Sequence, residues 1–341
     1  MSLRNSGMWQ RLHEWLPNEF KDGYASPYLS GNAEGQKTVI RFFKAGDSVP
    51  SLVLKGSRGE GQAAIESESQ ILGFLQSRST REGGLGFSAP TPLRSFEQGG
   101  WYYTMETAAP GHPLSELIFL RSRRRRMEIL RHELSRCAQI AETIPHVLDG
   151  AITAHRIDPS WYEIPLGVNL GEDVKAEVRL AASRCERAGL CAHGDFTIEN
   201  VFWESATEEV SVIDWELPMR GVPQLYDVYT LLLSSLPALA LEIPEITNSD
   251  NRLESQFRAA FFGTGPWAMA TREILERTSA ASDNPWLELL MFLVIRSNYF
   301  LWRQPALGRE YSRLLQFAAE HKKSFVGPVL ASTGFAQSSR V

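Results

Sequence analysis

The spacing of hydrophobic and polar positions changes about a third of the way along the chain. Before that point the apolar residues form short β-rich runs, Thr38 to Phe43, Ser51 to Lys55, Ala89 to Phe96 and Trp101 to Thr107. Between the second and third runs, Gly61 to Gln76 spaces its apolar residues as an amphipathic helix does. The order strand, strand, helix, strand, strand predicts a small antiparallel sheet with one covering helix.

From about Leu114 onward, apolar residues recur every three or four positions, which is typical of helices. The stretch Thr107 to Pro113, which contains Ala-Ala-Pro-Gly-His-Pro, interrupts regular structure and separates the two parts. The pattern therefore predicts a chain of mixed α and β structure in two parts. The expected helical segments include Leu130 to Ala141, Val174 to Cys185, Tyr226 to Leu241, Trp286 to Trp302 and Glu310 to His321.

Composition and charge narrow the class of protein. With 341 residues, 43% of them hydrophobic and 22% charged, the chain is expected to fold around real cores. A net charge of −5 argues against a general nucleic-acid or membrane-surface binder. The three cysteines form no C-x-x-C pair, and the longest apolar run, Leu287 to Ile295, is too short to span a bilayer. These features predict a soluble cytoplasmic protein.

One segment, Cys191 to Glu216, concentrates the candidate chemistry. Asp195 and Asn200 precede a short apolar strand, and Asp214 follows the next one. Because a hairpin carries the start of one strand and the end of the next to the same edge, we expect the three side chains to converge. Oxygen ligands without a matching set of histidines and cysteines favour a hard cation such as Mg²⁺. The segment therefore predicts a magnesium-assisted site.

The spacing H-G-D-x-x-x-x-N followed by I-D-W-E resembles the catalytic segment of the aminoglycoside phosphotransferase and choline kinase family, relatives of the protein kinases. The resemblance implies an α+β, protein-kinase-like two-lobe fold. Residues 1–106 would form the N-terminal nucleotide-binding lobe, a small antiparallel sheet with one helix, followed by a hinge at 107–113. Residues 114–330 would form a larger, mainly helical C-terminal lobe with the catalytic loop and acceptor site, and 331–341 a flexible tail.

The same resemblance implies direct in-line transfer of a phosphoryl group from ATP, or GTP, to a hydroxyl of a small molecule. Asp195 would be the catalytic aspartate that orients the acceptor hydroxyl and takes its proton, and Asn200 and Asp214 would hold Mg²⁺. His193 is expected to order the loop, and Asp227 to brace it from a later helix.

Nucleotide-binding residues are expected in the first part of the chain. Lys55 ends an apolar strand, as the lysine that contacts the α- and β-phosphates does in kinase-like lobes. Its glutamate partner is expected to be Glu68, with Glu66 as the alternative on the same helix. The resemblance places Gly31 and Asn32 in the loop over the phosphates.

The adenine is expected to meet the backbone at the hinge, where Met105, Glu106, Thr107 and Ala108 follow the strand residues Trp101 to Thr104. The arginine run from Arg121 to Arg126 has two interpretations, a solvated helix surface or a docking site for an acidic partner.

The acceptor remains open between three classes. An amino sugar would need carboxylates, a choline-like amine would need an aromatic cage, and a neutral metabolite would need neither. The oligomeric state is open as well. The candidate carboxylates are Glu242, Glu245, Asp250, Glu254 and Glu288, and the candidate aromatic residues are Trp267, Trp286, Tyr299 and Trp302.

Two rival hypotheses come from other classes. A catalytically silent kinase-like module would bind nucleotide or a protein partner, but it would not need Asp195, Asn200 and Asp214 together. A protein kinase would carry A-P-E after the metal aspartate and Asp-Phe-Gly in place of Asp-Trp-Glu. A small-molecule kinase therefore agrees best with the sequence.

Overall fold

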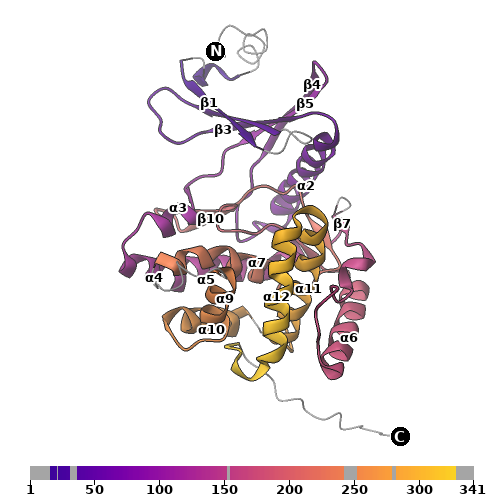
Figure 1. Cartoon of the computed structure of the whole chain (residues 1–341). Helices are drawn as coiled ribbons and strands as arrows, with labels where there is room; N and C mark the ends of the chain where they lie inside the picture. Colours follow the sequence, from indigo (N-terminus) through magenta and orange to yellow (C-terminus); the bar gives the residue numbers. More distant parts are fainter. Residues whose placement is uncertain are drawn as a thin grey trace, which may run out of the picture. The chain divides into compact units, whose positions relative to one another are not determined.

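The computed structural model describes residues 16–20, 22–30, 37–151, 154–241, 252–278 and 282–327, and the chain divides into two compact units. The first unit comprises Met1–Gly111 and Glu204–Glu216, and the second comprises His112–Trp203 and Leu217–Val341 (Figure 1). The second half of the Cys191 to Glu216 segment, residues 204–216, therefore belongs to the first unit, whereas its first half belongs to the second.

An antiparallel sheet forms the centre of the first unit, with strand order β1-β2-β3-β5-β4 (Figure 1). The register places Ile40, Leu54 and Met105 side by side on three neighbouring strands, and all three side chains are buried. Alternating side chains on these strands thus build one apolar face. The strands are β1 (Tyr24–Ser30), β2 (Lys37–Phe43), β3 (Leu52–Ser57), β4 (Pro92–Gln98) and β5 (Trp101–Thr107).

Helix α2 (Glu60–Glu82) packs against β3, β4 and β5 of this sheet. Its buried residues, among them Ile65, Leu72 and Leu75, lie on one face at helical spacing. The helix ends at Gly83, whose left-handed backbone (φ 74°) is the usual way to close a helix. This helix brings Glu68 to the sheet, where its carboxylate meets Lys55 of β3.

Strand β10 (Glu209–Val212) belongs to the first unit through the loop before β4. The N–H of Ser88 donates to Val210 O (2.8 Å), and the N–H of Val212 donates to Ser88 O (2.9 Å). The hydroxyls of Ser88 and Ser211 are 2.5 Å apart. These bonds fix the backbone two residues before Asp214.

The second unit is mainly helical, and α7 lies at its centre with nearly every side chain buried. Helices α11 and α12 run side by side in Figure 1 and share the most extensive helix contact of the unit. The helices are α3 (Leu114–Phe119), α4 (Arg123–Arg131), α5 (Glu133–Val147), α6 (Glu172–Ala188), α7 (Tyr226–Ser235), α9 (Arg252–Phe261), α10 (Pro266–Thr278), α11 (Pro285–Arg303) and α12 (Pro305–Glu320).

Short strands hold the segment with Asp195 and Asn200 in this unit. Strand β8 (Cys191–Ala192) pairs antiparallel with β11 (Met219–Arg220), which also pairs parallel with β7 (His155–Arg156). Strand β6 (His112–Pro113) pairs with the start of β9 (Val201–Glu204). The loop from His193 to Asn200 therefore begins and ends at paired strands.

The α+β fold class is confirmed, and the differences from the predicted elements have local causes. Strand β1 was not predicted, because Pro27 and two serines interrupt its apolar pattern, yet it pairs with β2 along its whole length. The helix expected up to Leu241 ends at Ser235 and continues as a 3₁₀ helix, Leu236–Leu241. Pro237 has no N–H to continue the α-helical ladder.

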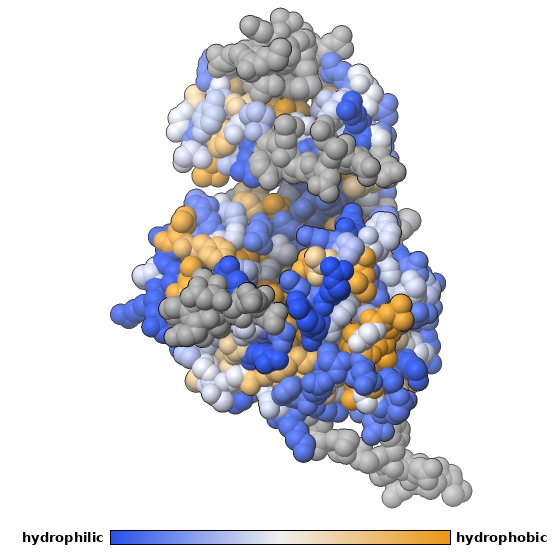
Figure 2. Space-filling model, in the orientation of Figure 1, coloured by the Kyte–Doolittle hydropathy of each residue, from blue (hydrophilic) through white to orange (hydrophobic). Residues whose placement is uncertain are grey.

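The described surface mixes hydrophilic residues with smaller groups of hydrophobic ones (Figure 2). Within the arginine run, Arg124 is 93% exposed and reaches Glu128, whereas Arg125 bridges Glu128 and the buried Glu133. Two arginines of the run therefore form ion pairs with nearby glutamates. Among the described residues, every helix is too short or too polar to cross a membrane.

Candidate active site

The ammonium group of Lys55 lies between two buried carboxylates of the first unit. Its Nζ is 2.5 Å from Glu68 Oε1 on α2 and 2.9 Å from Glu106 Oε1 on β5. All three side chains are at most 8% exposed. Glu66, the alternative partner, instead accepts a hydrogen bond from Gln62. The structure thus brings Lys55 together with Glu68, and it adds Glu106 as a second carboxylate.

Burial and the neighbouring charges shift the pKa values of Lys55 and Glu106. Burial by itself would lower the pKa of Lys55, but Glu106, Glu68 and Asp214 raise it above the ordinary value. Burial raises the pKa of Glu106 to about 7 even though Lys55 opposes the rise. Lys55 therefore stays charged at neutral pH, whereas burial disfavours the charged form of Glu106.

The backbone of Trp215 ties Asp214 and Glu216 to this cluster. The N–H of Trp215 donates to Glu68 Oε1 (3.1 Å), and its indole N–H donates to Val212 O (2.9 Å). The indole is fully buried. Asp214 has a left-handed backbone (φ 64°), a conformation that costs a non-glycine residue about 1 kcal/mol or more. The tryptophan of I-D-W-E is therefore an anchor that holds two flanking carboxylates in a strained turn.

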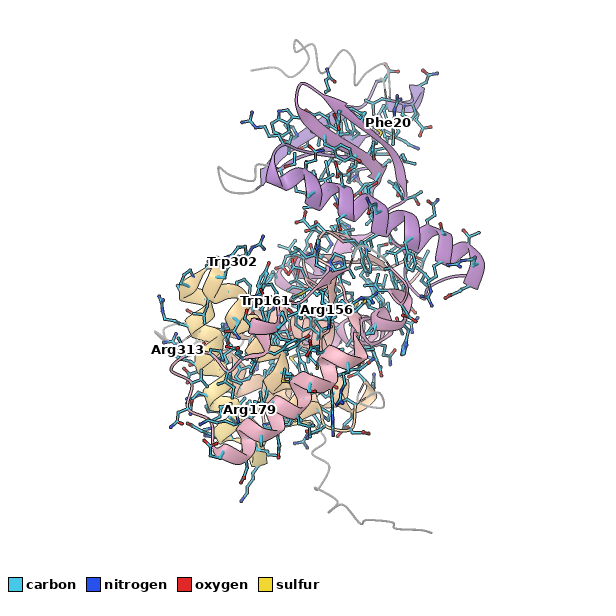
Figure 3. The ribbon with its side chains drawn as sticks, turned by 90° about the vertical axis from the view of Figure 1, so that its right-hand side faces the viewer. Phe20, Arg156, Trp161, Arg179, Trp302 and Arg313 are labelled. Atoms are coloured by element: carbon cyan, nitrogen blue, oxygen red, sulfur yellow. The ribbon has the colours of Figure 1, made fainter. Side chains whose placement is uncertain are left out.

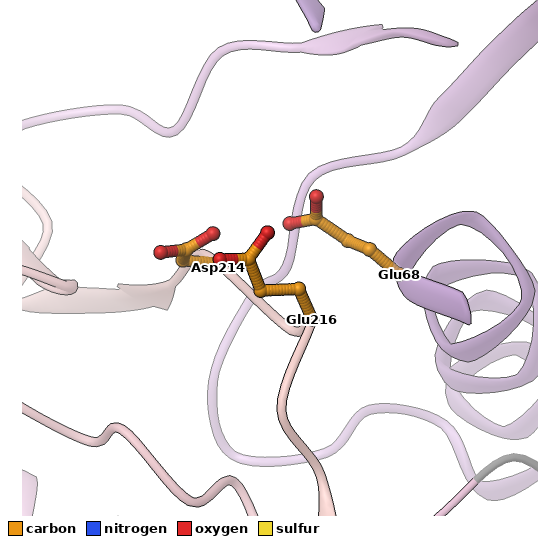
Figure 4. Close-up of side chains that lie close together, drawn as sticks. All are labelled: Glu68, Asp214 and Glu216. Atoms are coloured by element: carbon orange, nitrogen blue, oxygen red, sulfur yellow. The ribbon is translucent and has the colours of Figure 1, made fainter. Parts of the chain in front are cut away.

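Lys37, the first residue of β2, reaches these two carboxylates. Its Nζ is 3.1 Å from Asp214 Oδ1 and 2.8 Å from Glu216 Oε2. Burial opposes its charge, but Asp214, Glu68 and Glu216 together outweigh that effect, and the pKa of Lys37 is raised. One oxygen each of Glu68, Asp214 and Glu216 lie within 4.8 Å of one another. Figure 4 shows the three side chains close together. The first unit thus contains three carboxylates grouped as metal ligands can be.

In the second unit, the loop after β8 positions Asp195. The side-chain amide of Asn200 donates to the backbone oxygen of Asp195 (2.9 Å) and to its Oδ2 (3.1 Å). The N–H of Asn200 donates to Thr197 O, which closes the turn. With its nitrogen used in this way, Asn200 can offer Oδ1 to a metal ion. The two residues predicted from the motif are therefore in direct contact.

Asp227, in the first turn of α7, holds the start of the same loop. Its carboxylate accepts the N–H of His193 (2.7 Å) and the N–H of Gly194 (3.1 Å). His193 is fully buried, and its Nδ1 accepts the N–H of Asp195 (3.3 Å). Burial raises the pKa of Asp227 to about 6, against the lowering effect of His193 and the two N–H groups. Both residues contact the loop backbone, in agreement with the bracing roles that the resemblance implies.

Gly194 has a left-handed backbone (φ 87°), and a Cβ atom there would lie 2.1 Å from Leu217 O. Any side chain at this position would therefore collide with the backbone.

Arg296 of α11 contacts the backbone of the same loop. Its Nη1 lies 3.5 Å from Gly194 O, and its guanidinium faces the rings of Tyr226, Phe292 and Phe300 at 5.3–5.8 Å. The side chain is buried, and its Nε has no hydrogen-bond partner among the described residues. Burial disfavours the charge, but the surrounding groups, which include Asp195, raise the pKa of Arg296 further above its ordinary value. Arg296 therefore places a permanent positive charge behind the loop.

The expected hinge residues are paired on both sides within the sheet. Met105 lies opposite Leu54 and Arg94, and Glu106 lies opposite Val53 and Pro92. The N–H of Thr107 donates to Thr91 O (3.0 Å). Their contact with a nucleobase stays a prediction. Gly31 and Asn32, expected in the phosphate loop, lie outside the described residues.

The residues predicted as candidates for binding the acceptor mostly make other contacts in the structure. Trp286 and Trp267 are buried in the helical core, whereas Trp302 is 74% exposed at the end of α11 (Figure 3). Tyr299 packs edge-on against Trp161, with ring centres 5.3 Å apart. The four aromatic candidates therefore do not form one cage.

The carboxylate candidates are similarly scattered. Glu288 is partly buried and accepts the N–H of Leu225 (2.7 Å), and Glu254 pairs with Arg258. Glu242, Glu245 and Asp250 lie outside the described residues.

Sequence reasoning missed four residues of these clusters: Lys37, Glu106 as a side chain, Glu216 and Arg296. Glu216 carried a usable signal, because it is the last residue of the I-D-W-E motif. Arg296 carried a weaker one, since a lone arginine ends the apolar run of α11. Lys37 and Glu106 make their contacts with residues far away in the sequence, so no local sequence pattern indicates them.

Comparison with known proteins gives one family match. The model of the phosphotransferase enzyme family matches residues 40–262, more than half of the chain. A search of curated proteins finds no match. Among solved structures, the chain is similar to aminoglycoside phosphotransferase APH(3'')-Id from Streptomyces rimosus in complex with ADP and streptomycin. The identity is 11%, the match covers 80% of this chain and 98% of that one, and the TM-score is 0.46. It is also similar to an aminoglycoside-3'-phosphotransferase of type VIII, with 16% identity, 84% and 96% of the two chains covered and a TM-score of 0.47.

Proposed function

Because the chain belongs to the phosphotransferase enzyme family, we propose that it transfers the γ-phosphoryl group of ATP, or GTP, to a hydroxyl of a small molecule with the help of Mg²⁺. The expected family is confirmed by the match over residues 40–262, and the chain is a kinase of hydroxyl groups. The nucleotide, the metal and the acceptor are the parts that we add.

The observation that carries the proposal is the arrangement around Asp195. A side-chain amide from Asn200 orients its carboxylate, while Asp227 fixes the two N–H groups just before it. Phosphoryl transfer needs little covalent help from protein, and a carboxylate held in one orientation can align an attacking hydroxyl. Such an arrangement supports catalysis more than simple binding.

In the proposed reaction, Asp195 accepts the proton of the acceptor hydroxyl. The acceptor oxygen forms a bond to the γ-phosphorus while the bond to the β,γ-bridging oxygen breaks, and the nucleoside diphosphate leaves. Lys55, held by Glu68, neutralises charge on the α- and β-phosphates. Asn200 and Asp214 would hold Mg²⁺, which when bound supplies charge neutralisation at the phosphates.

The donor set fits such a cation. Asp214 and Asn200 offer carboxylate and amide oxygens, the ligands that Mg²⁺ prefers. In the first unit, Oε2 of the buried Glu68 has no hydrogen-bond partner among the described residues. One oxygen of Glu68 lies within 4.8 Å of oxygens of Asp214 and Glu216. An unpaired buried carboxylate oxygen is costly unless a cation approaches it.

For the acceptor we keep the three classes open, and a cytoplasmic location stays part of the proposal. All three cysteines are free thiols in the structure, which agrees with a reducing compartment.

A screen of nucleotide consumption tests the proposal. The purified chain is incubated with Mg²⁺ and ATP or GTP against panels of amino sugars, amino alcohols and neutral sugars, with Asp195→Asn as the matched variant. We expect acceptor-dependent formation of nucleoside diphosphate that the substitution abolishes. Nucleotide binding without turnover on any acceptor would instead indicate a catalytically silent module.

A further inference from the structure

The turn between helices α3 and α4 of the second unit carries positive charges that the proposed reaction does not use. Residues 119–125 are exposed without interruption, from the last residue of α3 into the first turn of α4. In Figure 1 this turn lies at the outer edge of the second unit, and Figure 2 shows strongly hydrophilic side chains projecting there. We call residues 119–126 the arginine corner.

The arginine corner concentrates charge of the opposite sign to the rest of the chain. Its eight residues include five arginines and no aspartate or glutamate, which gives a formal charge of +5. Since the whole chain carries −5, the remaining residues together carry −10. The overall charge therefore argues against a protein that is basic over its whole surface, but not against one with a single basic contact.

The start of a helix is an unfavourable place for these charges. Arg123 to Arg126 fill the first turn of α4, which has no acidic residue and no side-chain cap. The N–H groups that begin a helix give it a partial positive charge, so each arginine there lowers helix stability slightly. Ion pairs of Arg124 and Arg125 with Glu128 and Glu133 offset part of this cost. An external anion would offset more of it.

Two apolar side chains of the arginine corner are also open to solvent. Leu120 is 72% exposed and Phe119 is 37% exposed, whereas the preceding α3 residues Leu117 and Ile118 are buried. A soluble polyanion such as a nucleic acid would bind the arginines and leave these side chains in water. A lipid surface would accept both groups, because arginines meet the headgroup phosphates and apolar side chains enter the boundary with the acyl chains. The combination therefore favours a membrane as the partner.

We propose that the arginine corner docks the protein on the surface of an anionic phospholipid membrane. The arginines contact the headgroups, and Leu120 and Phe119 insert between them. At about 0.1 M salt, charges in solvent are screened over about 10 Å, so the membrane attracts the nearby arginines more than it repels the acidic remainder of the chain. This contact does not depend on the phosphoryl-transfer reaction, and it would hold the enzyme beside a membrane.

Co-sedimentation of the full chain with vesicles tests the proposal. The vesicles contain phosphatidylcholine alone or phosphatidylcholine with about 30% phosphatidylserine. We expect binding to the anionic vesicles only, and weaker binding as the salt concentration rises from about 0.05 M to about 0.5 M. The double variant Arg121→Gln with Arg124→Gln should weaken the binding at least about tenfold, since each arginine near an anionic surface contributes about fivefold. Leu120→Gln should weaken it about threefold or more.

Helix α6 supplies matched controls, because Arg179 and Leu180 are also an exposed arginine and an exposed leucine side by side (Figure 3). Arg179→Gln and Leu180→Gln remove the same chemical groups from another helix of the same unit, and both should leave vesicle binding unchanged. Every substituted side chain is exposed, so thermal midpoints equal to that of the wild type are expected and show that the variants fold.

Absence of binding to the phosphatidylserine vesicles would overturn the proposal, as would an equal loss of binding in the α6 controls. The same chain is also titrated with a DNA duplex and with polyglutamate. Tight binding to either one, together with vesicle binding that does not respond to Leu120→Gln, would identify a soluble polyanion as the partner and overturn the membrane assignment. None of these results bears on the proposed function, which fails only if turnover is absent.

Discussion

Replacing Asp227 by asparagine tests whether a buried carboxylate holds the catalytic loop at an electrostatic cost. The side chain is 2% exposed and accepts two backbone N–H groups, yet burial raises its pKa from 3.8 to about 6. At about 1.4 kcal/mol per pKa unit, this shift corresponds to roughly 3 kcal/mol. Because the pKa in the folded state is raised, this contribution to stability is fully present below pH 3.8. It is lost as the pH rises through about 6.

Asparagine has no such titration, so the difference in stability between wild type and variant should itself depend on pH. Asp227→Asn also turns one amide N–H toward a backbone N–H, which costs about 1–3 kcal/mol at every pH. We therefore expect the wild type to be more stable at pH 4, and its advantage to shrink by roughly 2 kcal/mol between pH 4 and pH 7. Other buried carboxylates, such as Glu106, cancel in the difference.

Urea titrations followed by far-ultraviolet circular dichroism at several pH values measure this difference. Asp173→Asn is the control, since Asp173 also lies in the first turn of a helix but is exposed. Its effect should stay within about 0.5 kcal/mol across the range. An Asp227→Asn difference that is constant with pH, or that grows as the pH rises, would refute the reasoning.

Three other substitutions have expected outcomes that the structure supports. Arg296→Met should lower kcat by at least about tenfold with little change in nucleotide affinity. Arg296→Lys, which keeps the positive charge, should recover part of the lost kcat. An equal loss of kcat in both variants would show that the charge is unimportant. Glu106→Gln should lower the Kd for Mg-ATP, measured by calorimetry, because one carboxylate no longer competes with the phosphates for Lys55; a higher Kd would contradict this. Gly194→Ala should destabilise the chain by several kcal/mol and abolish turnover, since its Cβ would lie 2.1 Å from Leu217 O; a normal thermal midpoint would contradict the clash.

Local patterns predicted the parts of this molecule that depend on neighbouring residues. The segment from Cys191 to Glu216 combines its polar residues at short spacing, so Asp195 and Asn200 could be named before their contact was seen. The pairing of Lys55 with Glu68 followed from the resemblance, because the family's glutamate precedes apolar positions by four and seven residues, as Glu68 precedes Leu72 and Leu75. Both predictions needed only local geometry and the resemblance to a known family.

Contacts between distant segments were harder to foresee. Lys37 looks like any lysine at a strand end, and only the returning Asp214 segment gives it partners. Glu106 alternates normally within β5, yet its carboxylate is buried against Lys55. Strand β1 was missed because a strand at a sheet edge tolerates proline and polar residues that weaken the pattern. In each case the deciding partner lies far away in the sequence.

The central claim is that Asp195 takes the proton of an acceptor hydroxyl during phosphoryl transfer. The most direct test compares wild type with Asp195→Asn on whichever acceptor supports turnover, measuring kcat and, separately, the Kd for Mg-nucleotide. A general base contributes about 10²- to 10⁴-fold to rate, so kcat should fall by that factor while the Kd stays within about threefold. Turnover that survives the substitution would contradict the account.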